Sequence, residues 1–138
     1  MGVYISKNRR LSGTNWRQVM DNAFDQYKII KRKTKRRPYV RSAYFTKEKV
    51  FLELFWHHLH EKQSLKDKTR RLKYFPCAIE LIEKNRQEPS VKMNPNRSGE
   101  LLYRFLGITP DGDSFAVQIK EDIKSRQKWL ISIFPLDK

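Results

Sequence analysis

The sequence predicts an α+β fold in which N-terminal helices pack on one face of a small C-terminal antiparallel sheet, a three-stranded meander or slightly larger. Two patterns lead to this prediction. Apolar residues recur at helical spacing up to about residue 84, and they alternate with polar residues from residue 100 onward. Helices followed by a run of short strands are typical of α+β proteins.

The front of the chain, residues 1–43, is predicted to be a basic segment with one helix. Residues 1–13 are polar and are expected to be loosely ordered. Thr14 or Asn15 is a suitable N-cap for the helix that follows. The Lys/Arg-rich run at 31–37 carries too much charge to pack in a core, so we expect it at the surface.

The remainder, residues 44–138, is predicted to form the α+β domain. A second helix is expected to begin near Thr46, and a third is expected over about residues 65–84. Pro76 either kinks the third helix or starts a new one, because proline disrupts a helix interior. Residues 85–99 contain several Pro, Asn and Gly residues and are predicted to be a long loop.

Three strands are predicted in the last part of the chain. Thr109-Pro110-Asp111-Gly112 has the composition of a hairpin turn, with proline fixing φ and glycine free to adopt a positive φ. The second strand alternates apolar and polar residues cleanly. The predicted strands are 100–108, 115–120 and 128–134.

Charge indicates the class of partner. The 138 residues include 30 Lys and Arg against 15 Asp and Glu, a net charge of +15. The excess lies mostly in residues 1–49, which carry +11, whereas residues 100–138 are neutral. A chain this basic attracts phosphate backbones, so RNA is the expected partner. No apolar run approaches the roughly 20 residues of a membrane span, so no membrane partner is expected.

The sequence lacks a Walker loop, a GxGxxG motif, a GxSxG motif and paired carboxylates framed for hydrolysis, and no cofactor is expected. Cys77 is the single cysteine, so no internal disulfide is expected, and a cytoplasmic location is predicted. Three histidines and one cysteine do not suggest a metal site.

The histidines of the predicted second helix are the candidate proton-transfer groups. Imidazole is the side chain best suited to proton transfer near neutral pH. His58 falls within the apolar stripe of this helix and precedes Lys62 by four residues, so that the two share a face. His57 and His60 are alternates. A packed core histidine explains the position of His58 equally well.

Cationic and polar side chains on the sheet are the candidate phosphate ligands. Gln118 and Lys120 point to the polar face of the predicted second strand, with Arg104 and Ser132 as candidate neighbours. A solvated outer face is the alternative reading. Four tyrosines near Lys and Arg could also stack on unpaired bases, with a core or rim position as the alternative reading: Tyr39, Tyr44, Tyr74 and Tyr103. The other expected RNA-binding residues are Lys31, Arg32, Lys33, Lys35, Arg36, Arg37, Arg70, Arg71 and Arg126.

Several blocks taken together resemble the phage and mobile-element branch of the barnase, EndoU, colicin D and RelE-like (BECR) nuclease superfold. The blocks are Lys49 to Leu59, Arg70 to Ile82, Leu102 to Thr109 with Asp111-Gly112, Phe115 to Glu121, and Leu130 to Pro135. The resemblance implies helices on one face of an antiparallel sheet and a scissile phosphate on the other. It also implies a metal-independent ribonuclease, toxin-like, that cuts transfer or messenger RNA and is restrained by an acidic antitoxin or immunity-like protein.

The function predicted on these grounds is a small endoribonuclease that cleaves RNA by attack of the ribose 2′-hydroxyl on the phosphodiester. His58 would be its base or acid, with Lys62, Arg104 and Lys120 stabilising the phosphorane. Two alternatives remain. One is a non-catalytic nucleic-acid-binding module of the same fold, and the other is an interaction domain for an acidic protein.

Overall fold

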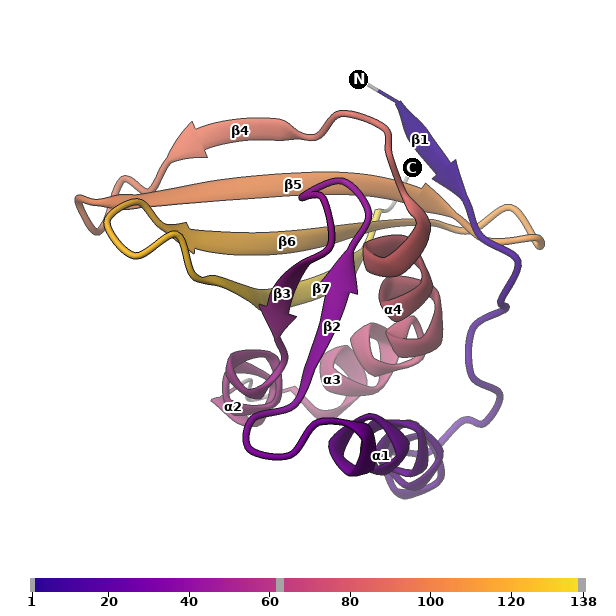
Figure 1. The fold of residues 1–138 in the computed structure, drawn as a ribbon. Coiled ribbons are helices and arrows are strands. Elements are labelled where there is room, and N and C mark those ends of the chain that lie inside the picture. The colour runs from indigo at the N-terminus through magenta and orange to yellow at the C-terminus, as the bar shows by residue number, and fades with distance from the viewer. Residues whose placement is uncertain (1, 62–63, 137–138) are drawn as a thin grey trace.

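The computed structural model describes residues 2–61 and 64–136, which contain four helices and one seven-stranded mixed sheet (Figure 1). The elements in chain order are β1 (Val3–Ile5), α1 (Trp16–Lys33), β2 (Tyr39–Ser42), β3 (Glu48–Phe51), α2 (Glu53–Glu61), α3 (Leu65–Leu72), α4 (Phe75–Lys84), β4 (Ser90–Met93), β5 (Glu100–Ile108), β6 (Ser114–Asp122) and β7 (Lys128–Pro135). The strand order is β1-β5-β6-β7-β3-β2, and β4 also pairs with β5.

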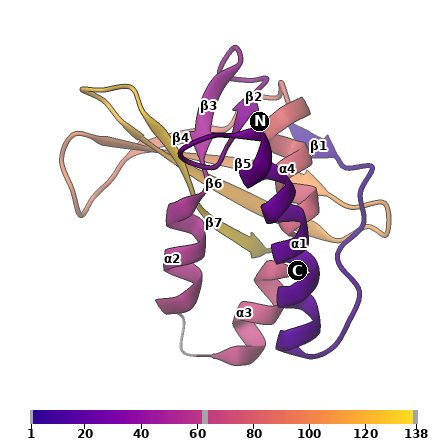
Figure 2. The same cartoon turned by 60° about the horizontal axis from the view of Figure 1, so that its bottom comes forward.

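The sheet is curled, and the helices lie on one side of it (Figures 1 and 2). We call this side the inward face. Phe105, Val117 and Ile133 are neighbours across β5, β6 and β7, and all three are buried on it. Helix α1 contributes Val19 and Ala23 to the same core. The opposite side of the sheet, which we call the open face, carries the alternate residues of each strand.

The prediction of a small three-stranded C-terminal antiparallel sheet is wrong. The three predicted strands correspond to β5, β6 and β7, but four further strands join them, and two of the pairings are parallel. The additional strands have only three or four residues each. Segments this short show too few alternations to be distinguished from loops, and β4 lies within the stretch predicted as a loop.

The segment before α1 is fixed to the body of the protein, so the prediction that it is loosely ordered is wrong. The carboxylate of Glu80 on α4 accepts hydrogen bonds from the hydroxyls of Tyr4 and Ser6 and from the backbone amides of Lys7 and Asn8. Burial alone would raise the pKa of Glu80, but these hydrogen bonds outweigh it and hold the pKa below its ordinary value.

The second helix begins later than predicted. Thr46 and Lys47 have φ values of 55° and 66°, so they form the turn of the β2–β3 hairpin and not a helix cap. Pairing of the two strands buries Val40 and Val50. The helix therefore starts only at Glu53.

Pro76 starts a new helix, which was one of the two alternatives. Helix α3 ends at Leu72, and Pro76 lies in the first turn of α4, where its missing amide hydrogen leaves no partner unsatisfied. Within the described residues, no helix is long and apolar enough to cross a membrane.

Candidate functional site

The strongest candidate site is a notch where helices α2 and α3 meet the edge of β7. Strand β3 pairs with β7 only at Lys128 and Trp129, so in the described part of the chain no strand continues along this edge. Helices α2 and α3 pack there instead. They leave a cavity of about 390 Å³, here called the edge notch, which is lined by Phe55, His58, Leu59, Glu61, Arg71, Ile131, Ser132 and Ile133.

His58 is held against the edge of β7. Its Nδ1 lies 3.3 Å from the carbonyl oxygen of Ile131. A carbonyl only accepts hydrogen bonds, so Nδ1 must carry the proton and donate it. In the neutral imidazole, Nε2 then keeps its lone pair and is free to exchange a proton with a ligand. The side chain is half-buried.

Arg71 supplies a fixed cation at the rim of the edge notch. Its Nη1 donates to Ser132 Oγ at 3.2 Å and its Nε donates to Asp67 Oδ2 at 2.9 Å. The guanidinium carbon lies 5.7 Å from the centre of the Phe134 ring. A guanidinium anchored in this way presents its remaining donors in a defined direction, which suits recognition of a phosphate.

The open face of the sheet continues from Ser132. In the register of the strands, Ser132 lies opposite Gln118, and Gln118 lies opposite Arg104. Arg104 is exposed, and its guanidinium lies 5.2 Å from the centre of the Phe134 ring, the ring that Arg71 also contacts. Three of the predicted site residues therefore form one row that leads to the edge notch.

The other candidates on the second helix lie away from the notch. His57 is exposed, and its Nε2 is 3.7 Å from Glu61 Oε1. His60 is also exposed. Neither is among the described residues that line the notch. Lys62 falls outside the described residues.

Lys120 lies on the open face but is already engaged. Its Nζ is 3.3 Å from Glu100 Oε2 and 5.0 Å from the centre of the Trp129 ring, and only 18% of its side chain is exposed. The ion pair anchors its ammonium group over Trp129.

The run at 31–37 forms a second basic site. Lys31 and Arg32 are exposed in the last turn of α1. The following residues border a hollow of about 490 Å³, here called the basic pocket, which is lined by Lys33, Lys35, Arg36, Arg37, Tyr39, Lys49 and Phe51. Arg37 also pairs with Glu53 at the start of α2. The basic pocket therefore places the cations that follow α1 beside residues of β2 and β3.

Arg70 is next to Arg71 in sequence but faces another part of the surface. It lines a groove beside Trp16 and Leu65 and a hollow beside Tyr74. The structure therefore places these two arginines, both expected to bind RNA, at different hollows of the surface.

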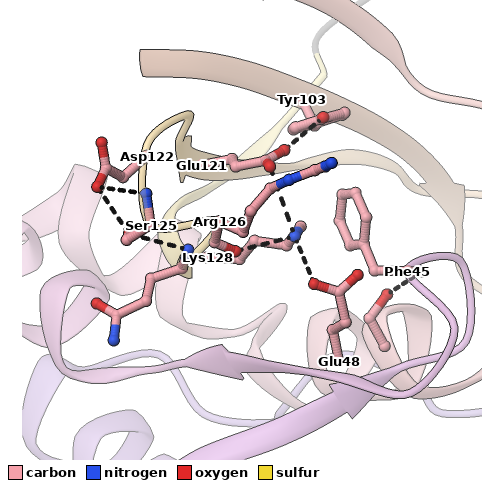
Figure 3. Close-up of polar contacts among 10 residues, drawn as sticks. Phe45, Glu48, Tyr103, Glu121, Asp122, Ser125, Arg126 and Lys128 are labelled. Carbon is pink, nitrogen blue, oxygen red and sulfur yellow. Dashed lines mark hydrogen bonds and ion pairs between the residues drawn. The ribbon is translucent and has the colours of Figure 1, made fainter. Parts of the chain in front are cut away.

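Arg126 belongs to a polar cluster at the far end of β7 (Figure 3). The ammonium of Lys128 is 2.8 Å from Glu48, 3.7 Å from Glu121, and donates to the carbonyl of Arg126 at 3.1 Å. Glu121 accepts a hydrogen bond from Tyr103 at 2.6 Å, and burial together with this carboxylate raises the pKa of Tyr103. Lys128 is 2% exposed, and its contacts with Glu48 and with the carbonyl of Arg126 connect β3 to the β6–β7 turn.

Cys77 is not a nucleophile. It is fully buried, and burial raises the pKa of its thiol to about 11. The thiolate is the reactive form, so a thiol with this pKa is inert at neutral pH.

The sequence did not point to three residues that the structure places at these sites. Glu61 lines the edge notch, Phe51 lines the basic pocket, and Trp129 lies beneath Lys120. Glu61 follows His58 by three residues on a helix, and this spacing could have placed the two on neighbouring positions of one face. For Phe51 and Trp129 the sequence held no signal, because their proximity depends on the parallel pairing of β3 with β7.

No protein-family model, curated protein or solved structure matches this chain. The resemblance to the nuclease superfold therefore stays a prediction from the sequence blocks that carry it.

Proposed function

We propose that this protein is a metal-independent endoribonuclease that cleaves RNA at the edge notch. The observation that supports the proposal best is the convergence of His58, Glu61 and Arg71 on one cavity that opens beside a basic sheet face. These residues supply two groups able to transfer protons and one cation, which is what cleavage through a 2′-hydroxyl requires.

The proposed reaction has two proton transfers. The carboxylate of Glu61 takes the proton of the 2′-hydroxyl, and the 2′-oxygen attacks the adjacent phosphorus. For this step His58 enters as the imidazolium, with Nδ1 still donating to Ile131, and it gives its Nε2 proton to the departing 5′-oxygen as the P–O5′ bond breaks. The products are a 2′,3′-cyclic phosphate and a free 5′-hydroxyl. Arg71 stabilises the phosphorane that forms after the attack and before the P–O5′ bond breaks. Exchange with water then restores both groups.

The roles proposed for the remaining residues are in binding. Arg104, Gln118 and Ser132 would contact the phosphates on either side of the notch, and the basic pocket would attract RNA from solution. Arg70 and Arg126 lie outside the notch and would contribute only through their charge. Lys120 would act as a cation over Trp129. An acidic inhibitor protein remains a prediction of the sequence resemblance.

The test is incubation of the purified protein with a defined RNA oligonucleotide in EDTA. We expect cleavage products that end in a 2′,3′-cyclic phosphate, and no cleavage of the DNA oligonucleotide of the same sequence, which lacks the attacking hydroxyl. Arg71→Gln should reduce the rate by about 100-fold or more, since removal of one preorganised donor typically costs this much. Arg70→Gln removes the same charge from the neighbouring position and is the matched control.

A non-catalytic RNA-binding protein is the second candidate. The basic pocket and the cations of the open face favour it, because they extend well beyond the notch. If the wild-type protein binds the RNA and leaves it intact, the second candidate replaces the first.

A further inference from the structure

Three aromatic residues form a row across neighbouring strands of the open face. In the strand register, Tyr39 lies opposite Phe51 and Phe51 lies opposite Trp129. The rings of Tyr39 and Phe51 are 6.1 Å apart at an angle of 74°. We call these three residues the aromatic row. Adjacent strands are about 4.8 Å apart, so the row spans about 10 Å from β2 to β7.

The aromatic row is not part of the core. The residues that alternate with it, Val50 on β3 and Leu130 on β7, are fully buried on the inward face. The three rings point the other way and remain partly exposed. Large apolar side chains on the solvent side of a basic protein suggest a surface that binds a ligand.

Each ring carries a cation on its face. The Arg37 guanidinium lies 4.0 Å from the Phe51 ring centre, and the Lys49 ammonium lies 4.7 Å from that of Tyr39. Lys120 lies 5.0 Å from the Trp129 ring. A base that stacks on an aromatic ring gains more than an exposed cation–π contact is worth. An arriving base can therefore take the place of the cation on the ring, and the displaced cation can then pair with the phosphate of that nucleotide.

The row lies close to the edge notch. Trp129 and Ser132 are on the same strand, three residues apart. A register shift between β6 and β7 places them opposite Lys120 and Gln118, so both lie on the open face. Their separation corresponds to about 10 Å of extended chain. A strand of RNA with one phosphate in the notch would thus place neighbouring nucleotides near Trp129. Bases in a duplex are paired and already stacked on each other, so only unpaired nucleotides can use these rings.

We infer that the aromatic row binds unpaired bases next to the scissile phosphate, so that the substrate is a single-stranded segment of RNA. The inference rests on the proposed function for the location of the cleaved bond. The binding of unpaired bases by the aromatic row does not depend on the proposed cleavage, since it requires only the rings and their cations.

The test measures binding of a fluorescent 12-nucleotide oligo-dT, which has no 2′-hydroxyl and cannot be cleaved by the proposed reaction. Trp129→Leu should weaken binding by roughly 5- to 100-fold, the usual effect of losing one stacked base. Binding of a blunt DNA duplex should change less than twofold. Trp16→Leu is the matched control, because Trp16 is also partly exposed beneath a lysine, with Lys68 at 5.7 Å, but lies on α1.

A second variant covers the case in which Trp129→Leu fails to fold. Tyr39→Leu changes a strand at the margin of the sheet and should also weaken oligo-dT binding selectively. Equal losses for single strand and duplex, or a loss as large in Trp16→Leu, would overturn the inference. Selective loss of single-strand binding without any RNA cleavage by the wild type would support the row and contradict the proposed reaction alone.

Discussion

Replacing His58 tests whether the edge notch performs chemistry or only packs. In His58→Asn, the amide Nδ2 occupies a position close to that of imidazole Nδ1, so it can still donate to the carbonyl of Ile131. The group at the Nε2 position is lost. His58→Ala removes both. The two variants therefore separate the structural contact from proton transfer.

The structure sets the scale of the two effects. A single hydrogen bond contributes about 0.5–1.5 kcal/mol to stability, and the contact at 3.3 Å is a long one. His58→Ala should thus lower the melting temperature by only a few degrees. A typical domain has about 5–15 kcal/mol of stability, so more than nine molecules in ten stay folded. Loss of an acid in catalysis costs about 10²–10⁴ in rate, and unfolding on this scale cannot imitate it.

The assay is the initial rate of cleavage of an RNA oligonucleotide from pH 5 to 9, with the melting temperature of each variant measured alongside. We expect the initial rate of cleavage to fall by about 10²–10⁴-fold in both variants. His58→Asn should keep a wild-type melting temperature. His60→Asn, at an exposed position of the same helix, is the control and should be unaffected. Full cleavage by a folded His58→Asn protein would refute the assignment.

Three further outcomes are expected. Replacing Lys33, Lys35 and Arg36 with Ser should reduce the slope of log Kd against log salt by up to about 2, near 0.7 for each lost contact with single-stranded RNA; an unchanged slope would remove the basic pocket from the binding site. Phe115→Ala should destabilise the protein by about 3–5 kcal/mol in urea unfolding, because the ring is fully buried and stacks on a tyrosine. Glu80 has a pKa below its ordinary 4.5 in the folded state, so the unfolded chain binds more protons and the stability contributed by this carboxylate is lost as the pH falls through that lowered pKa. Glu80→Gln should flatten this part of the stability curve, and an identical acid dependence in both proteins would contradict the account.

Local patterns in the sequence were enough for features that depend on neighbouring residues. Of the two predicted caps of α1, Asn15 is the one used, since its side chain accepts a hydrogen bond from the amide of Gln18 at 2.9 Å. The hairpin turn before β6 also forms as expected, with Gly112 at a φ of 87° and its amide bonded to Thr109. Such features follow from conformational preferences over a few residues.

The net charge, the long central strands and the position of His58 on a helix were likewise fixed by the sequence itself. The short strands and everything that depends on their register were not. Pairing of β3 with β7 joins residues nearly eighty positions apart and brings Phe51 beside Trp129. The contact of His58 with Ile131 is equally remote in the chain. A segment of three or four residues has no stable conformation of its own, so only the packing of the whole protein decides whether it becomes a strand and which face its side chains take.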